Sequence, residues 1–249
     1  METSEVGKSA KYELISYHTD RTIEGDGLEF ISPTSSLPES DTQGQLTLDM
    51  IGSTFSNAPT PAVDYVSRTV LEKEILALLR DERHSIVTMV GRGGIGKTSL
   101  AVTVLRELAE AGDFFATFWF GARDIDLLAE GPKLVKPGVL STEDIAREYL
   151  SLVNGDWKAS GAASVVEYSA QSLRGKVWDE PVLFVFDNFE TVRSPTELYD
   201  FIDTYVRLPN KVLLTSRSRD FKGDYPVNIA GMRRECRRSS NPPRLGWSV

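Results

Sequence analysis

The sequence predicts an α/β fold, in which a mostly parallel sheet of five strands lies between two layers of helices. Short runs of β-branched and aromatic residues alternate along the chain with amphipathic segments of helical periodicity. A glycine-rich segment, GRGGIGKT at residues 91–98, separates one such run from the helical segment that follows it. This alternation is typical of parallel sheets, because parallel strands need long connections that are usually helices.

The chain divides by composition into three parts. Residues 1–62 are acidic and rich in Ser, Thr, Pro and Gly, with weak periodicity, so we expect a mostly disordered leader or linker. Residues 63–232 contain the periodic segments and are expected to form the folded domain. Residues 233–249 contain five arginines and a Pro-Pro pair without periodicity, and they predict a disordered basic tail.

Within the domain, helices and strands are expected in alternation. Helical periodicity is found at residues 69–82, 99–112, 141–153, 165–178 and 196–208. Dense β-forming runs are found at residues 85–90, 114–124, 182–188, 211–220 and 224–232. Residues 126–141, which include two prolines and two glycines, and residues 154–164 are expected to be loops.

The glycine-rich segment satisfies the P-loop pattern G-x-x-x-x-G-K-[ST], which predicts a nucleoside triphosphate site. Its glycines allow a tight turn whose backbone N–H groups point at phosphate oxygens, beside the positive end of a helix. Lys97 is expected to reach the β- and γ-phosphates, and Thr98 to bind Mg²⁺. The expected nucleotide contacts are Gly91, Gly93, Gly94, Ile95, Gly96, Lys97, Thr98 and Ser99.

Two later strands end in polar residues that belong at the same sheet edge. The apolar run VLFVFDN delivers Asp187, which we expect to bind Mg²⁺ directly or through water. A structural aspartate at the end of a strand is the alternative. The strand KVLLTSRSRD ends near Arg217, which is expected beside the γ-phosphate, with a solvated basic loop as the alternative.

Composition excludes several other classes. The net charge of -8 argues against broad electrostatic binding to nucleic acid. One cysteine excludes an internal disulfide, and with only two histidines a Cys/His metal site is not expected. No apolar run approaches the roughly 18 residues of a membrane span, and the polar start lacks the core of a signal peptide, so a cytoplasmic setting without membrane contact is expected.

In this order, the motifs resemble the STAND class of signalling P-loop ATPases, which includes the NB-ARC modules of plant disease-resistance and animal apoptosis proteins. The resemblance spans residues 65–232. It rests on VSR at 66–68, the P-loop, FWFGARD at 118–124, LFVFDNFE at 183–190 and KVLLTSRSRD at 211–220. The family's helical subdomain and winged-helix domain have no counterpart after Met232, so the resemblance implies a C-terminally truncated member.

The resemblance also implies roles for individual residues. Val66 and Arg68 would line an adenine pocket, and Arg217 would sense the γ-phosphate. Members hold ADP in a closed state, exchange it for ATP to open and self-associate, and hydrolyse slowly. Asn188 stands where the family often has an acid, and an amide cannot act as a general base, which favours a switch. The side chains that would carry any turnover are Lys97, Asp187 and Arg217.

The sequence therefore predicts an ATP/ADP-binding switch core that is at most a slow Mg²⁺-dependent ATPase. Protein partners, or self-association through the nucleotide domain, are compatible with this prediction. Three alternatives remain open at this point: an AAA+-like motor ATPase, a nucleic-acid-binding regulator that uses the basic tail, and an inert truncated fragment.

Overall fold

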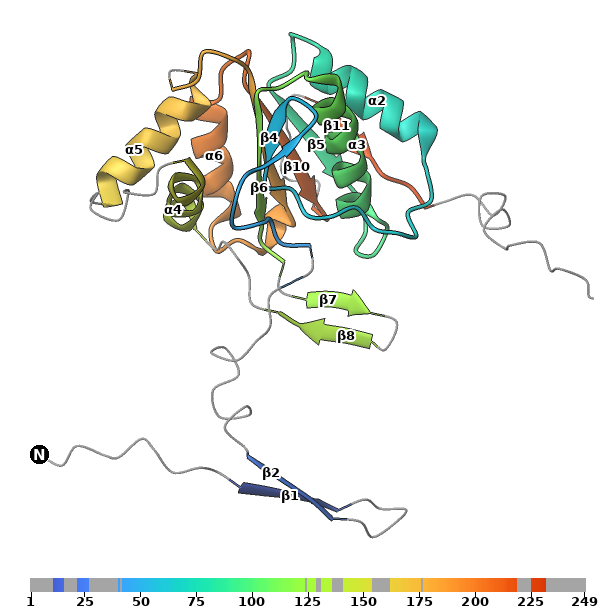
Figure 1. Cartoon of the computed structure of the whole chain (residues 1–249). Coiled ribbons are helices and arrows are strands. Elements are labelled where there is room, and N and C mark those ends of the chain that lie inside the picture. The colour runs from blue at the N-terminus through green and yellow to red at the C-terminus, as the bar shows by residue number, and fades with distance from the viewer. Residues whose placement is uncertain are drawn as a thin grey trace, which may run out of the picture.

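The three-dimensional structure of the chain is a computed structural model (Figure 1). The residues that it describes are 11–15, 22–26, 40, 42–123, 125–128, 131–135, 141–153, 162–175, 177–218 and 225–231. The predicted basic tail at residues 233–249 lies outside the described residues, as do residues 154–161 of the second predicted loop.

The centre of the fold is a seven-stranded sheet in the order β11-β5-β10-β9-β6-β4-β3. Every neighbouring pair is parallel except β3 with β4, which are antiparallel. The strands are β3 (Asp49–Ile51), β4 (Thr54–Ser56), β5 (Ile86–Val90), β6 (Ala116–Gly121), β9 (Val182–Asp187), β10 (Lys211–Ser216) and β11 (Tyr225–Asn228). The predicted α/β class is confirmed, and the sheet contains the five predicted strands and two more.

Helices cover both faces of this sheet (Figure 1). One layer is α2 (Thr69–Arg80) and α3 (Lys97–Ala111), and the other is α4 (Thr142–Val153), α5 (Ala162–Leu173) and α6 (Pro195–Tyr205). A short 3-10 helix, η2 (Phe189–Thr191), directly follows β9. The predicted three-layer arrangement is therefore present.

The two layers create two separate cores because successive side chains of a strand point to opposite faces. In β9, Phe184 and Phe186 belong to the core under α4–α6, whereas Leu183 and Val185 belong to the core under α2 and α3. All six residues of β9 are buried. A strand that is buried on both faces brings its final carboxylate, Asp187, to the sheet edge with little exposure to water.

Strands β3 and β4 come from the segment that was expected to be an unstructured leader, and they extend the sheet past β6. Polar side chains hold this segment to β6. The Thr54 hydroxyl donates to the Phe114 carbonyl at 2.6 Å, and the Asn57 amide both donates to the Trp119 carbonyl at 3.0 Å and accepts from the Trp119 N–H at 2.6 Å. These contacts need few apolar residues, so the segment lacks the alternating apolar pattern by which a strand is predicted from sequence.

Two hairpins also lie in segments that were not expected to form strands. β7 (Ile125–Leu128) and β8 (Gly131–Leu134) pair antiparallel within the stretch predicted as a loop. Pro132 is tolerated there because each strand of a two-stranded sheet has a free edge. β1 (Lys11–Ile15) and β2 (Thr22–Asp26) form the second hairpin, within the predicted leader.

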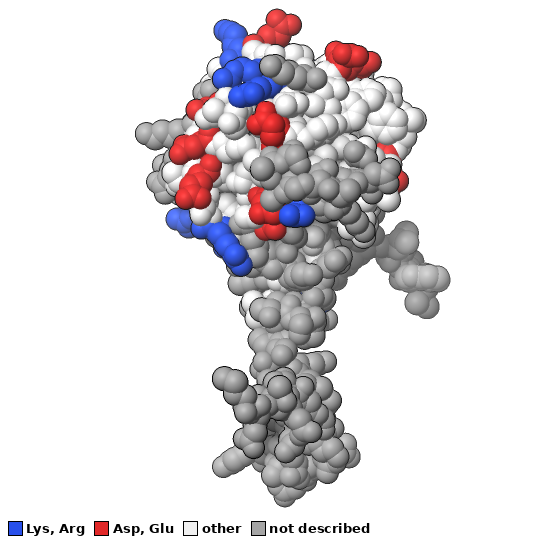
Figure 2. All heavy atoms as spheres, turned by 90° about the vertical axis from the view of Figure 1, so that its left-hand side faces the viewer, with Lys and Arg blue, Asp and Glu red and all other residues white. Residues whose placement is uncertain are grey.

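The surface over α4, α5 and α6 is of mixed charge. Figure 2 shows acidic and basic side chains interspersed on this face. Among the described residues, no helix is both long and apolar enough to cross a membrane.

Candidate functional site

The P-loop connects the end of β5 to the first turn of α3 at the carboxyl edge of the sheet. Gly94 and Gly96 have φ angles of 71° and 86°, a left-handed conformation that other residues rarely adopt. Gly91 is required for a different reason, because a Cβ atom there would lie 2.9 Å from the Ile229 carbonyl oxygen. Helix α3 begins at Lys97, so its free N–H groups face the loop.

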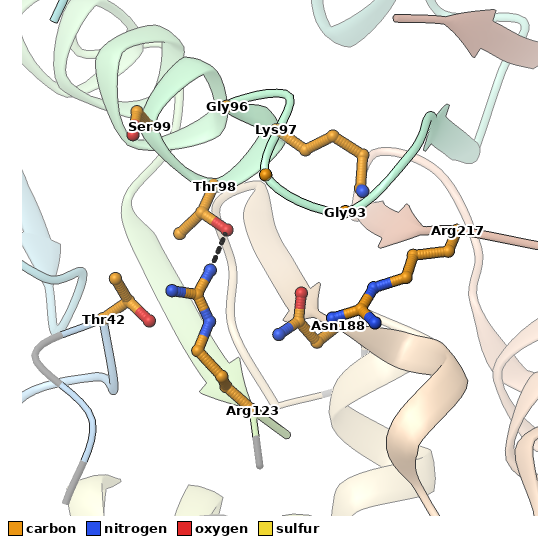
Figure 3. A pocket seen from close by; sticks show the side chains of 10 residues that line it. Thr42, Gly93, Gly96, Lys97, Thr98, Ser99, Arg123, Asn188 and Arg217 are labelled. Atoms are coloured by element: carbon orange, nitrogen blue, oxygen red, sulfur yellow. Dashed lines mark hydrogen bonds between the residues drawn. The ribbon is translucent and has the colours of Figure 1, made fainter. Parts of the chain in front are cut away.

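A pocket of about 310 Å³ opens above the P-loop (Figure 3). The loop and the first turn of α3 contribute Gly93, Gly94, Gly96, Lys97, Thr98 and Ser99. The remaining lining residues come from four other places in the chain: Thr42, Arg123, Asn188 and Arg217. The walls of the pocket are therefore assembled by the tertiary fold as well as by the motif.

The ammonium group of Lys97 lies inside the loop. The side chain is 6% exposed, and its Nζ donates to the Gly91 carbonyl at 2.7 Å and to the Arg92 carbonyl at 3.2 Å. Burial lowers the pKa of Lys97, while the nearby carboxylates of Glu190 and Asp187 act in the opposite direction. The lysine thus holds a cation at the point where the loop N–H groups would receive an anion.

Asp187 forms the centre of a buried polar cluster. Its Oδ1 accepts from the Thr215 hydroxyl at 2.6 Å, and the Thr98 Oγ1 lies 3.0 Å from Oδ1 and 2.9 Å from Oδ2. Burial raises the pKa of Asp187, and the hydrogen bonds from Thr215 and Thr98 and the charge of Arg123 oppose that rise. The adjacent Asn188 adopts a left-handed φ of 57° and donates its N–H to Thr215 at 3.0 Å.

The cluster has the donor chemistry that Mg²⁺ prefers. Thr98 offers a hydroxyl oxygen and Asp187 offers carboxylate oxygens, and the two groups come from different elements that meet at one point. Mg²⁺ takes oxygen ligands and keeps several waters, so one or two protein groups beside a phosphate are enough to hold it. The residues present therefore fit this ion.

Two arginines face the pocket from the ends of neighbouring strands. Arg217 follows β10 and its Nε lies 3.0 Å from the Glu190 carboxylate. Arg123 follows β6, donates to Thr98 Oγ1 at 2.7 Å and lies 3.8 Å from Asp187 Oδ2 (Figure 3). Sequence reasoning did not select Arg123 as a site residue. The available signal was the expected parallel sheet, which places the residues after each strand at one edge.

Only some of the predicted site residues line the pocket. Val66, Arg68, Gly91, Ile95 and Asp187 are not among the residues that line the pocket, although Asp187 contacts Thr98 directly. Arg68 reaches the P-loop from outside: one guanidinium nitrogen donates to the Ile95 carbonyl at 2.7 Å. Another donates to the Ala230 carbonyl at 3.3 Å, so Arg68 connects the loop to the segment after β11.

No protein-family model and no curated protein matches the chain. Among solved structures, the chain is similar to the ORC1 protein of Aeropyrum pernix in complex with DNA, with 17% identity and a TM-score of 0.49, over 68% of this chain and 47% of that one. It is also similar to a STAND protein with a tetratricopeptide repeat sensor from Pyrococcus horikoshii, with 15% identity and a TM-score of 0.43, over 76% of this chain and 26% of that one.

A third similar structure is a Walker-type ATPase of Pyrococcus abyssi, with 17% identity and a TM-score of 0.45, over 71% of this chain and 57% of that one. At these identities and TM-scores the likenesses carry no argument about activity or partners. The P-loop between β5 and α3, the central parallel strands and the carboxylate at the end of β9 define the fold class: this is a P-loop NTPase fold.

Proposed function

We propose that the chain is the ATP/ADP-binding switch core of a STAND-type regulator, with slow or no hydrolysis. One observation carries this proposal: Lys97, the Thr98–Asp187 pair and Arg217 converge from three elements around a single pocket of about 310 Å³. Lys97 would contact the β- and γ-phosphates, the Thr98–Asp187 pair would bind Mg²⁺, and Arg217 would contact the γ-phosphate. A pocket assembled in this way matches a triphosphate better than a simple anion.

The roles follow from the contacts. The P-loop N–H groups and Lys97 would hold the β- and γ-phosphates. Thr98 and Asp187 would hold Mg²⁺, which neutralises phosphate charge when it is bound. Arg217, whose side chain is 48% exposed, would exchange Glu190 for the γ-phosphate. For Arg68, which is fixed to the P-loop backbone, and for Val66, which precedes it, the role of contacting the adenine rests on the resemblance alone.

Hydrolysis also needs a base that orients the attacking water. Asn188 follows Asp187 and offers an amide, which cannot accept a proton. Glu190 is the nearest alternative base, but its carboxylate lies 3.0 Å from Arg217. The proposed move of Arg217 to the γ-phosphate would release Glu190, so the amide at position 188, and not this pairing, is what supports a nucleotide switch over an AAA+-like motor.

The nucleotide released when the purified protein is denatured tests the proposal. Bound ADP is the expected result. Phosphate release at saturating ATP and Mg²⁺ should be below about 0.1 s⁻¹, under the range of common enzyme turnover numbers. Lys97→Ala serves as the contamination control: fast turnover that this substitution removes would make the chain a complete ATPase and contradict the switch.

A further inference from the structure

Building on the proposed nucleotide site, we propose that Arg123 is a resident cation that occupies the Mg²⁺ ligands Thr98 and Asp187 until the metal displaces it. Arg123 thereby sets how strongly nucleotide binding depends on Mg²⁺. The guanidinium group points from the end of β6 across the pocket to Thr98, between Thr42 and Asn188 (Figure 3).

The Thr98 hydroxyl contacts both Arg123 and Asp187. Its Oγ1 accepts a hydrogen bond from Arg123 at 2.7 Å and donates its own proton to the Asp187 carboxylate, with Oγ1 2.9 Å from Oδ2. A hydroxyl that binds Mg²⁺ uses an oxygen lone pair as the ligand. Arg123 already occupies that side of the oxygen, so the guanidinium and the metal compete for the same atom.

The two oxygens of Asp187 have different neighbours. Oδ1 accepts from Thr215 at 2.6 Å, a contact that fixes this oxygen toward β10. Oδ2 lies 3.8 Å from the Arg123 guanidinium nitrogen that binds Thr98. Oδ2 is therefore the Asp187 oxygen that lies near Arg123, although Asp187 itself is buried beneath the pocket. The Arg123 guanidinium thus binds Thr98 Oγ1 directly and lies near Asp187 Oδ2, the two oxygens that we expect to hold the metal.

Arg123 has a fixed backbone and a partly exposed side chain. Its backbone is fixed, because the neighbouring Ala122 N–H donates to the Asp187 carbonyl at 3.0 Å. Its side chain is 20% exposed and lines the pocket of about 310 Å³ together with the P-loop. A displaced guanidinium therefore stays in reach of a bound phosphate, for which its planar donors are well suited.

Two bound states follow from this geometry. Without Mg²⁺, Arg123 keeps Thr98 and Asp187 paired and supplies positive charge near the phosphates, so ADP still binds. When Mg²⁺ is bound, Thr98 and Asp187 would hold it, and the Arg123 side chain would turn to the phosphates.

The test is calorimetric titration of ADP at constant ionic strength, with excess Mg²⁺ or with EDTA. The quantity compared is the ratio of the metal-free Kd to the Mg²⁺ Kd. Arg123→Gln should raise this ratio by about tenfold, the effect of one charge-assisted hydrogen bond. Arg123→Lys, which keeps the charge, should give a ratio between those of the wild type and Arg123→Gln.

Two further variants act as controls. Arg106→Gln removes the same charge from an exposed arginine of α3 that pairs with Glu110, and it should leave the ratio unchanged. Asp187→Asn removes a proposed metal ligand and should lower the ratio toward one, opposite to Arg123→Gln.

The outcomes separate this inference from the proposed function. If wild type and Arg123→Gln both bind ADP with the same ratio, or if Arg123→Lys behaves like Arg123→Gln, the inference on Arg123 is wrong and the nucleotide site stands. If the wild type binds ADP in neither condition, the proposed function itself is wrong.

Discussion

Two buried lysines at opposite edges of the same sheet illustrate how structural and functional charges differ in this molecule. Lys97 follows the P-loop at the carboxyl edge and is 6% exposed, and Lys211 begins β10 at the amino edge and is 4% exposed. Both ammonium groups donate to backbone carbonyl oxygens. Burial alone therefore does not distinguish a binding residue from a structural one.

The hydrogen-bond partners do distinguish them. Lys211 donates to the carbonyls of Leu78, Asp81 and His84, which use all three of its N–H groups at the carboxyl end of α2. Within the described residues, Lys97 donates to two carbonyls of its own loop and keeps one N–H for a ligand. A buried cation with unused capacity beside a pocket indicates a site, whereas a saturated one indicates a structural contact.

Lys211→Met should give the largest loss of stability in this comparison. It leaves the carbonyls at the end of α2 without their cation, so the free energy of unfolding should fall by about 2 to 4 kcal/mol. ADP affinity of the folded variant should stay within about twofold, because Lys211 lies at the opposite sheet edge. Urea denaturation and ADP titration measure the two effects. If the Lys211→Met variant is as stable as the wild type, Lys211 does not stabilise the end of α2.

Arg217→Ala should lower the affinity for ATP while sparing ADP, because only ATP presents a γ-phosphate to the end of β10. The expected change in the ATP/ADP affinity ratio corresponds to about 1.5 to 3 kcal/mol, one hydrogen bond between charged groups. Parallel titrations with both nucleotides in Mg²⁺ measure the ratio. An unchanged ATP/ADP affinity ratio would show that Arg217 is a solvated loop residue that does not contact the γ-phosphate.

Glu148 in α4 provides a smaller test, in a layer remote from the P-loop. Burial, with a contribution from the negative charge of Asp144, raises the pKa of Glu148 from 4.5 to about 7. The folded protein therefore holds a proton that the unfolded chain releases, so stability should fall as pH rises from about 4.5 to about 7 and then level off.

Glu148→Gln should remove that fall and raise stability at pH 8 by about 1 to 2 kcal/mol. Thermal unfolding of wild type and variant between pH 4.5 and 8 measures it. Parallel pH profiles for the two proteins would show that Glu148 ionises normally, and nucleotide affinity should be the same in both.

The fold was largely predictable because its central strands and helices are specified by local patterns. The run around Phe184 and Phe186 is apolar on both faces, and the helices carry apolar residues at helical spacing. Strand β4 could not be predicted in this way. It is held by the hydroxyl of Thr54 and the amide of Asn57, contacts that exist only after β6 is in place.

The site likewise contains residues that short motifs identify and residues that only the tertiary fold brings into place. The P-loop and Asp187 are encoded in short motifs with known chemistry, so sequence was sufficient to select them. Arg123 and Thr42 were missed because their positions depend on strand order and on the path of the amino-terminal segment. The Trp119 indole N–H donates to the Thr42 carbonyl at 3.2 Å and fixes that segment beside β6.

The carboxyl edge of the sheet is expected to bind ATP and ADP through the P-loop. The most direct measurement is calorimetric titration of both nucleotides, with Mg²⁺, into the wild type and Lys97→Ala, with the unfolding midpoint of each protein as the control for folding. We predict one site per chain in the wild type and an affinity reduced by about tenfold or more in Lys97→Ala, since the charge-assisted phosphate contact of the remaining Lys97 N–H is lost while the apolar core is unchanged. A wild-type protein that binds neither nucleotide, or a folded Lys97→Ala variant that binds as tightly as the wild type, would contradict the account.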